Sequence, residues 1–435
     1  MRRLAVDPLW RLIVALLLLL SGAHVSHAEQ GRIVDAATGL GIGGATVTIA
    51  QQIVLADPSG MFHASDSPAA VQARAPGYRA ASLTAAAFSQ NGDVLRLTPF
   101  RPKALYLSFY GVGSEAIRGA ALKVMHEAGL NALVIDVKGD RGLIAYRSGI
   151  KLAQQVGAQR VITIPDLPAL LQSLRQQGLY LIARIVTFKD DPMATARPDL
   201  AVRLQNGQLF RDREGLAWTD PALTEVAQYN IDVGVEAARA GFDEIQFDYL
   251  RFPDAPHGVG FARPTTQVDR LQAIAGFLAE ARRQLAPFNV YLAADIFGYV
   301  CWNLTDTGIG QRLEDIMPLV DYLSPMLYPS GFQFGIPGYR DPVAHPYEIV
   351  RQSLKRARAR LGVAPIRFRP WLQAFKDYAF DRRTFAAGDV ALQTRAASDF
   401  GSDGWMLWNP RNAYGNVALA EAEQAAIPAA FPCSE

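Results

Sequence analysis

Cysteine and histidine are scarce in this sequence. Of its 435 residues, two are cysteine and six are histidine. Cys301 and Cys433 have no neighbours that complete a redox or metal-binding motif, although they could form one disulfide bond if they met in space. No His-x-His or His-Glu-x-x-His spacing occurs, and no Asp with two clustered histidines suggests a metal-dependent deacetylase. The sequence therefore predicts no metal site.

Motifs for nucleotides and for serine nucleophiles are also missing. No Gly-x-Gly-x-x-Gly follows the first strand predicted beyond residue 100, and no Gly-Lys-Ser/Thr occurs anywhere. No Gly-x-Ser-x-Gly elbow appears either. We therefore expect no cofactor and no Ser-His-Asp hydrolase. The net charge is only +2, which argues against a nucleic-acid partner or an anionic membrane surface.

Long hydrophobic runs are absent except at the amino terminus. Basic residues up to Arg11 precede an apolar run at 12–20, and the small residues Ser26 and Ala28 suit cleavage after Ala28. The run is short for a membrane span, so an uncleaved anchor is the second interpretation. Residues 1–28 thus predict a signal peptide and an exported protein, either periplasmic or secreted.

The sequence pattern of residues 29–99 is typical of short strands separated by turns. Segment 45–49 alternates apolar and polar residues, and Asp57-Pro58-Ser59-Gly60 has the composition of a turn. This spacing predicts an all-β sandwich of about 70 residues. The positions that match a known pattern are Gly31, Ile33, Asp35, Ala45, Val47, Ile49, Asp57, Gly60, Phe62, Gly77 and Tyr78. Through them the segment resembles the carboxypeptidase-regulatory-like domain, which implies a non-catalytic accessory module.

Beyond a linker at 100–103, apolar strand-like runs alternate with amphipathic helix-like segments. The eight predicted strands are 104–109, 132–138, 180–188, 244–252, 290–297, 322–328, 368–375 and 404–408. The predicted helices between them are 117–127, 167–177, 224–240, 267–285, 347–361 and 389–399. Eight such units predict an α/β fold, a (β/α)₈ TIM barrel over residues 103–431. A doubly wound open sheet is the alternative, and the missing phosphate-binding glycine loop favours closure.

The fourth predicted strand carries the clearest sign of chemistry. With period two, Ile245, Phe247 and Tyr249 share one face, while Gln246 and Asp248 lie on the other. Asp248 falls near the carboxyl end, where barrels of parallel strands place their active sites. The simpler interpretation of Asp248 is an ion pair with a nearby arginine.

Inward positions near the other strand ends complete a candidate site. The predicted catalytic residues are Asp248 and Asp295, and the predicted substrate-binding residues are Asp136, Arg184, Tyr328, Trp371, Gln373, Trp408 and Asn409. Carboxylates, amides and aromatic faces at one mouth suit a carbohydrate, because sugars present both hydroxyl groups and C–H faces. Lys138 is also expected inward, beside Asp136. Trp405 and Trp408 could instead plug the barrel, and Arg184 could serve to orient a carboxylate or to lower its pKa.

Hydrolysis of a glycosidic bond needs two carboxyl groups, one protonated and one ionised. Asp248 and Asp295 lie on adjacent predicted strands, whose ends place side chains roughly 5 to 6 Å apart. We expect this pair to provide the two groups. Asp295 could also be a buried, hydrogen-bonded aspartate, in which case Asp136 is the next candidate for the acid.

Four motifs in order carry a resemblance across the barrel. They are Ala-Leu-Val-Ile-Asp-Val-Lys-Gly-Asp at 132–140, the Asp-Glu-Ile-Gln-Phe-Asp-Tyr core of 241–253, Ser-Pro-Met-Leu-Tyr-Pro at 324–329 and Arg-Pro-Trp-Leu-Gln at 369–373. In these the chain resembles the bacterial family called "putative glycosyl hydrolase domain". The resemblance implies a (β/α)₈ barrel with glycosidase chemistry.

A more distant similarity is to the chitinase-like hydrolases, whose fourth strand reads Asp-x-x-Asp-x-Asp-x-Glu. Asp243, Gln246, Asp248 and Leu250 occupy those four places, Met326 and Tyr328 match the sixth strand, and Trp408 matches the eighth. Leu250 stands where that family has its general acid. The similarity therefore implies that any acid catalysis must come from Asp295 or Asp136.

Two functions from different classes follow. The first is an exported glycoside hydrolase that cleaves a polysaccharide or oligosaccharide with the Asp248–Asp295 pair. The second is a non-catalytic carbohydrate-binding protein that docks at the cell envelope through its sandwich. A lyase or transglycosylase using the same carboxylates is a third.

Overall fold

The computed structural model describes residues 29–415 except 51, 65–68, 255–258 and 264. The predicted signal peptide at 1–28 and Cys433 lie outside the described residues, so neither the cleavage nor the disulfide prediction is tested. Cys301 is buried. Within the described ranges, no helix is both long and apolar enough to cross a membrane.

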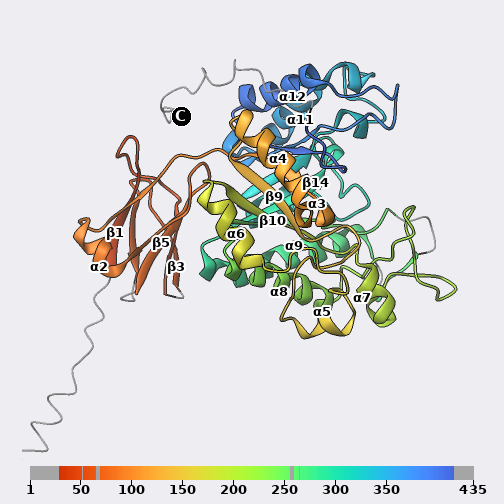
Figure 1. The fold of residues 1–435 in the computed structure, drawn as a ribbon, viewed down its shortest axis with the longest axis horizontal. Helices are drawn as coiled ribbons and strands as arrows, with labels where there is room; N and C mark the ends of the chain where they lie inside the picture. Colours follow the sequence, from red (N-terminus) through yellow and green to blue (C-terminus); the bar gives the residue numbers. More distant parts are fainter. Residues whose placement is uncertain (1–28, 51, 65–68, 255–258, 264, 416–435) are drawn as a thin grey trace, which may run out of the picture.

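Two sheets form the small amino-terminal part of the molecule (Figure 1). One has the order β4-β1-β7 and the other β3-β2-β5-β6. The elements are β1 Glu29–Asp35, β2 Thr46–Ile49, β3 Gln52–Leu55, β4 Met61–Ala64, β5 Ala70–Arg74, β6 Ala81–Thr84, α2 Ala85–Gln90 and β7 Val94–Leu97. A separate hydrophobic core with Ile33, Val47, Phe62 and Val71 joins them. The predicted all-β sandwich is confirmed, whereas its carboxypeptidase-regulatory-like family stays a prediction.

Eight parallel strands close into a barrel, in the order β10-β12-β14-β15-β16-β17-β8-β9. Their bounds are β8 Lys103–Leu107, β9 Ala132–Lys138, β10 Tyr180–Val186, β12 Glu244–Asp248, β14 Tyr291–Phe297, β15 Tyr322–Met326, β16 Trp371–Gln373 and β17 Trp405–Trp408. Every predicted barrel strand is present, and the predicted (β/α)₈ architecture is confirmed. Strands β9, β10 and β12 are buried along their whole length, as parallel strands covered on both faces must be.

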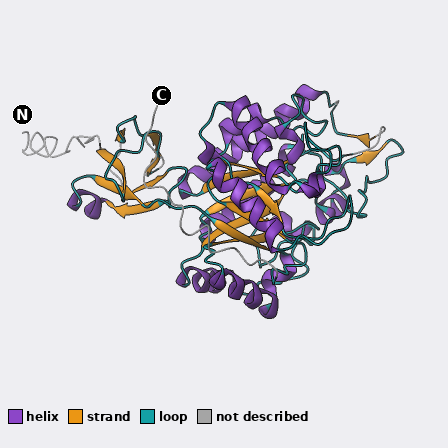
Figure 2. Cartoon of the chain, turned by 90° about the horizontal axis from the view of Figure 1, so that it is seen from above, coloured by secondary structure: helices purple, strands orange, loops and turns teal. Residues whose placement is uncertain are grey.

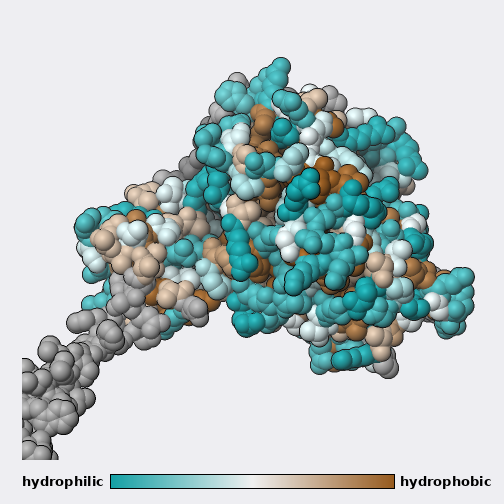
Figure 3. Space-filling view, turned by 60° about the horizontal axis from the view of Figure 1, so that its bottom comes forward, coloured by the Kyte–Doolittle hydropathy of each residue, from teal (hydrophilic) through white to brown (hydrophobic). Residues whose placement is uncertain are grey.

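Helices surround the barrel (Figures 1 and 2). They are α3 Phe109–Gly113, α4 Glu115–Glu127, α5 Lys151–Gln155, α6 Leu167–Gln176, α7 Asp191–Ala196, α8 Thr224–Ala240, α9 Gln267–Leu285, α10 Leu313–Ile316, α11 Pro346–Leu361 and α12 Ala387–Phe400. A small ribbon of β11 Arg203–Leu204 and β13 Val259–Gly260 stands outside the barrel. The six predicted helices correspond to α4, α6, α8, α9, α11 and α12. On the face seen in Figure 3, hydrophobic side chains form small separate areas among hydrophilic ones.

The barrel has two hydrophobic layers. Outward residues such as Ile245 and Phe247 pack with the helices in one large core. Inward residues, among them Ala132, Ala293 and Trp371, form a second core inside the barrel. Small alanines face the large aromatic rings inside, which lets the interior fill without voids. The alternation predicted for the fourth strand is therefore confirmed for Ile245, Phe247 and Gln246.

A β-bulge corrects the prediction for the end of the second barrel strand. In the strand register, Arg184 of β10 lies opposite Asp136 of β9, but the next residue, Ile185, lies opposite Lys138. Val137 is therefore the extra residue. A bulge shifts the alternation by one position. Lys138 consequently points outward, where its Nζ lies 2.7 Å from Asp190 and donates to Asn230 of α8 at 2.8 Å. The expectation that Lys138 faces inward is wrong, while Asp136 does face inward.

Strand β12 ends at Asp248 rather than at residue 252. Gly241, with φ 108°, ends α8 and turns the chain into β12, and glycine tolerates that left-handed conformation. At the other end, Tyr249 has φ 48°, which an extended strand does not allow. Tyr249 therefore leaves the outward face predicted for it, and Asp248 becomes the last residue of the strand.

The amino-terminal ends of the barrel strands carry a buried ion network. Arg369 pairs with Glu244 and, at 2.8 Å, with Asp403. Tyr180 donates its hydroxyl to Glu244 at 3.0 Å. All of these side chains are essentially inaccessible to solvent. A charge can be buried when it is paired and hydrogen-bonded, so this network closes one end of the barrel as a polar plug.

The sandwich docks against that same end. The Tyr291 hydroxyl, at the start of β14, lies 2.8 Å from the carbonyl oxygens of Ala75 and Tyr78 and accepts from the Ala75 amide at 3.2 Å. The Tyr322 hydroxyl accepts from the Gly77 amide at 3.1 Å. The sandwich thus covers the amino ends of the strands and leaves the carboxyl ends free.

We predict that Tyr291→Phe destabilises the docking of the sandwich on the barrel. The substitution removes the acceptor of the buried Ala75 amide and a hydrogen bond to the Ala75 and Tyr78 carbonyl oxygens, which costs about 1–3 kcal/mol. In calorimetric unfolding, the first transition of the variant should occur at a lower temperature than that of wild type. Tyr110→Phe, at a tyrosine that is 57% exposed, is the control and should leave the transition unchanged. Equal transition temperatures for Tyr291→Phe and Tyr110→Phe would contradict the docking role of Tyr291.

Candidate active site

A cavity of about 880 Å³ opens at the carboxyl ends of the barrel strands. Its wall includes the ends of β12, β14 and β17, at Asp248, Asp295 and Trp408. Its aromatic members are Tyr249, Phe297, Tyr328, Phe332, Phe375, Tyr378, Phe385 and Trp408, and its charged members are Arg184, Glu214, Asp248, Arg251, Asp295, Lys376 and Arg411. Its size and its mixture of rings with a few polar groups are typical of a binding site for a small molecule or a polymer segment.

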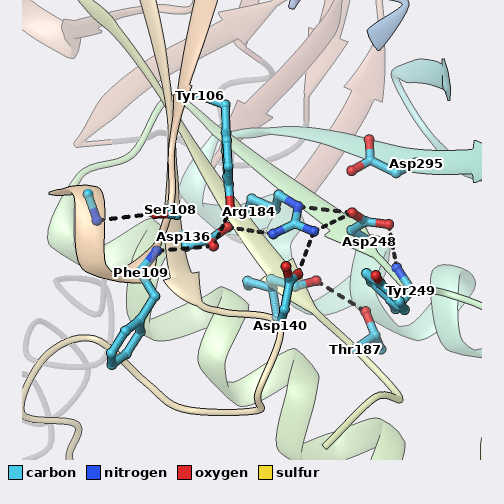
Figure 4. Close-up of polar contacts among 12 residues, drawn as sticks. Tyr106, Ser108, Phe109, Asp136, Asp140, Arg184, Thr187, Asp248, Tyr249 and Asp295 are labelled. Atoms are coloured by element: carbon cyan, nitrogen blue, oxygen red, sulfur yellow. Dashed lines mark hydrogen bonds and ion pairs between the residues drawn. The ribbon is translucent and has the colours of Figure 1, made fainter. Parts of the chain in front are cut away.

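Arg184 of β10 is the centre of the polar contacts beneath the cavity (Figure 4). Its guanidinium donates to Asp136 at 2.6 Å and to Asp140 at 2.9 Å. It donates twice to Asp248 Oδ2, at 2.9 Å from Nε and 2.6 Å from Nη2. The Arg184 side chain is only 1% exposed. One cation therefore holds carboxylates from β9, from the loop after β9 and from β12.

Burial and charge compete within this cluster. Burial raises the pKa of Asp136 to about 6, with Asp140 adding to the effect and Arg184 opposing it. Although burial disfavours the charged guanidinium, Asp136, Asp248 and Asp140 raise the pKa of Arg184 well above its usual range. Tyr106 of β8 also donates its hydroxyl to Asp136 at 2.7 Å. Asp136 does not line the cavity, so its role is to hold Arg184.

Asp295 is in a different environment from Asp248. Its Oδ1 accepts a hydrogen bond from Trp371 Nε1 at 2.8 Å, while its buried Oδ2 has no partner in the described part of the chain. Burial, and then the nearby negative charge of Asp248, raise the pKa of Asp295 well above its ordinary value. A neutral carboxylic acid can stay at such a site and donate a proton from the unpartnered oxygen.

Asp248 is instead held as an ion-paired carboxylate. Besides the two hydrogen bonds from Arg184, its Oδ1 accepts from the backbone amide of Tyr249 at 2.6 Å. The left-handed conformation of Tyr249 redirects its side chain, which lies in the cavity wall. The two carboxyl groups on adjacent strands thus lie in contrasting environments, one ion-paired with an arginine and one buried without a cation. Acid–base chemistry uses such contrasts.

The structure brings six of the nine predicted site residues to the cavity wall. They are Arg184, Asp248, Asp295, Tyr328, Trp408 and Asn409. The Trp408 ring stacks on Tyr106 with centroids 3.9 Å apart and lies over Arg184. Both Asn409 amide hydrogens are used by the carbonyl oxygens of Ala374 and Ala413, so Asn409 shapes the wall rather than offering donors.

Trp371, Gln373 and Asp136 do not line the cavity. Trp371 and Gln373 are fully buried, so the expectation that Trp371 stacks on a sugar is wrong in this conformation. Trp371 acts on Asp295 through its indole N–H. Gln373 accepts from the Ser330 amide at 3.0 Å and donates to the Ser330 hydroxyl at 2.7 Å. Both residues support the wall from below.

Several cavity residues were missed because they follow the strands rather than belong to them. Tyr249 and Arg251 come after β12, Lys376 and Tyr378 after β16, and Arg411 after β17. Their one common signal in the sequence is their place within six residues of a predicted strand end. Asp140 shares that signal. Leu250, at the place of the chitinase acid, is fully buried in the core between barrel and helices.

We predict that Arg184→Met lowers the free energy of unfolding by about 3–5 kcal/mol, because it leaves buried carboxylates without their cation. The measurement is urea-induced unfolding. Arg197→Met is the matched control, because Arg197 also bridges two carboxylates, Asp199 and Glu225, but at a partly exposed site. There solvent screens the charges, so the cost should be much smaller. Equal losses in the two variants would contradict the central role of Arg184.

We predict that Asp295→Asn stabilises the protein at pH 7–8. The pKa of Asp295 is raised in the folded state, so the carboxyl group costs no stability below its unfolded pKa and becomes destabilising as pH rises through the folded value. Asparagine keeps the acceptor for Trp371 and removes this cost, which should raise Tm by roughly 2–4 °C for each kcal/mol gained. The gain should vanish near pH 3.

Asp377→Asn is the control of opposite sign. Against the effect of burial, hydrogen bonds from the Ser330 hydroxyl and three backbone amides lower the pKa of Asp377 to about 2. Its carboxylate therefore stabilises the fold above its unfolded pKa, and Asp377→Asn should lower Tm at neutral pH. An Asp295→Asn protein that melts lower than wild type at pH 8 would show that Asp295 is not held neutral.

Several solved structures are similar to this chain. A hypothetical protein from Ruminiclostridium thermocellum ATCC 27405 is 34% identical, with 44% of this chain and 96% of that chain covered and a TM-score of 0.38. The PgaB (BpsB) glycoside hydrolase domain from Bordetella bronchiseptica is 13% identical, with 74% and 100% covered and a TM-score of 0.52. A beta-galactosidase from the psychrophilic Marinomonas ef1 is 12% identical, with 70% and 54% covered and a TM-score of 0.50. The last two share the barrel fold.

No curated protein matches the sequence. A family model, in contrast, matches residues 104–414, which is the whole barrel and more than half of the chain. Its description is "Putative glycosyl hydrolase domain". The match agrees with the four motifs at the ends of the second, fourth, sixth and seventh barrel strands. The chain belongs to this family of glycosyl hydrolase domains.

Proposed function

We propose that the protein is an exported glycoside hydrolase that cleaves O-glycosidic bonds of a polysaccharide, with Asp295 as general acid and Asp248 as nucleophile or base. The single observation that carries the proposal is the contrast between the two carboxyl groups. Asp295 is buried with one oxygen unpartnered, Asp248 is ion-paired with Arg184, and both line one cavity.

In this proposal each carboxyl group carries one step. Asp295 donates the proton of its unpartnered oxygen to the glycosidic oxygen as the bond to the anomeric carbon breaks. Asp248 either attacks the anomeric carbon or removes a proton from the attacking water, and Arg184 keeps its carboxylate in place. The rings of Tyr328 and Trp408 offer faces for stacking on the sugar. Export is supported by the basic and apolar pattern of residues 1–28.

The test is the release of reducing ends from a panel of polysaccharides by full-length wild type, Asp248→Asn and Asp295→Asn. We expect a loss of roughly 10²-fold or more in each variant. With an aryl glycoside that has a good leaving group, Asp295→Asn should recover activity, because no proton is needed, whereas Asp248→Asn should not. The exposed Asp341→Asn is the control and should behave as wild type. Equal turnover by wild type and Asp248→Asn would remove Asp248 from the chemistry.

The pH profile gives an independent check. A general acid works only while it is protonated, so wild-type activity should fall as pH rises through the raised pKa of Asp295. In Asp295→Asn, assayed on the activated substrate, that alkaline limb should be absent. Binding of a polysaccharide by wild type without any release of reducing ends would instead favour the non-catalytic carbohydrate-binding function.

A further inference from the structure

Arg251 is a cation in the cavity wall without an ionic partner of its own. It follows Asp248 by three residues and lines the same cavity. Its Nη1 donates to the carbonyl oxygen of Phe252 at 3.0 Å. Among the described residues, no carboxylate lies within ion-pair distance of its guanidinium; the negative charges of Asp248, Asp254 and Asp212 act on it from farther away.

Aromatic rings surround this guanidinium instead of carboxylates. The ring centroids of Trp218, Tyr249 and Phe297 lie 4.9, 5.5 and 5.9 Å from its central carbon. Cation–π contacts fix the plane of a guanidinium but leave its charge uncompensated. Burial lowers the pKa of Arg251, and the nearby negative charges oppose this effect without forming an ion pair with it. An anion at its free edge would therefore be bound favourably.

The carboxyl groups that share the cavity are already engaged. Asp248 is paired with Arg184, and Glu214 is paired with Lys189 at 2.8 Å. Asp295 is held neutral by its burial. None of these is left to neutralise Arg251 or the other cations of the wall.

Two more cations face the cavity from its rim. Lys376 and Arg411 are exposed lining residues. In the part of the chain that the structure describes, neither side chain has a carboxylate at ion-pair distance. With Arg251 they give the open side of the cavity an excess of positive charge, although the chain as a whole carries a net charge of only +2. Such local focusing attracts anionic ligands.

We propose that the cavity is a subsite for an anionic sugar, with Arg251 binding an oxyanion on the glycan, either a uronate carboxylate or a sulfate ester. The inference rests on the proposed function and names the substrate class of the same site. A guanidinium presents two parallel N–H groups that match two oxygens of such an anion. Because Arg251 and Asp248 line one cavity within three residues, the charged substituent belongs to a sugar near the bond that is cleaved.

The test is affinity electrophoresis of the full-length protein through gels that contain one polysaccharide each. Three gels carry polyuronates, three carry sulfated galactans and three carry neutral glucans, galactans and mannans. We expect retardation in at least one anionic gel, with the polyuronate and sulfated arms showing which oxyanion is bound. In Arg251→Gln, the affinity measured from that retardation should fall about tenfold or more, because a charge-assisted hydrogen bond is lost. Arg251→Lys should be intermediate.

Arg356→Gln is the matched control, because it removes the same charge from the exposed face of α11, away from the cavity. Its retardation should equal that of wild type. Retardation in neutral gels alone, equal retardation of Arg251→Gln and wild type, or none in any anionic gel would overturn the proposal. Binding does not depend on turnover, so Arg251-dependent retardation without release of reducing ends would leave the anionic subsite standing and remove the hydrolase.

Discussion

A buried carboxylate needs a cation, and in this barrel one arginine serves two of them together with a third, more exposed carboxylate. Arg184 lies on β10 between the strands that carry Asp136 and Asp248, and it also reaches Asp140 in the loop after β9. Without it, taking Asp248 out of water would be strongly unfavourable. The guanidinium fork fixes the direction of the Asp248 carboxylate as well as its charge. The position of the reactive carboxylate therefore depends on a residue of the neighbouring strand.

The same barrel has a second buried ion network that can be compared with the Arg184 cluster. At the amino ends of the strands, Arg369 is held between Glu244 and Asp403 in an equally buried network. That network is covered by the sandwich, and none of its members lines the cavity. Charge pairing inside the barrel is therefore a structural solution at both ends. What makes the carboxyl end a candidate active site is the cavity above it and Asp295, which shares the interior but has no cation of its own.

The period-two pattern of the sequence was sufficient to predict the eight strands and the inward direction of Arg184, Asp248 and Asp295. It could not predict the bulge at Val137, because an extra residue in a strand leaves no mark in the alternation until pairing is known. Nor could it predict the left-handed conformation of Tyr249, which depends on how the loop after β12 returns over the barrel. Both features decide which side chains reach the cavity.

The sequence also could not predict how deep in the barrel each inward side chain lies. Trp371 and Asp295 both point inward, but the stagger of the strands places Trp371 below the cavity floor and Asp295 in its wall. The structure thus turns a predicted sugar-stacking ring into a hydrogen-bond donor to Asp295. Arg251 escaped because the predicted strand ran to residue 252 and its alternation put Arg251 on the outward face, whereas β12 ends at Asp248.

The neutral acid and the unpaired arginine are linked by electrostatics. In the proposed reaction Asp295 keeps its proton until the glycosidic oxygen takes it. The main charges near it are Asp248, which favours the protonated form, and Arg184, which opposes it. An anionic sugar bound at Arg251 would bring a further negative charge into the same low-dielectric cavity. That charge would help Asp295 to remain protonated while Arg251 compensates the substituent itself. One site can therefore both bind an acidic substrate and keep Asp295 protonated. A cationic substrate would instead favour loss of the Asp295 proton before the reaction.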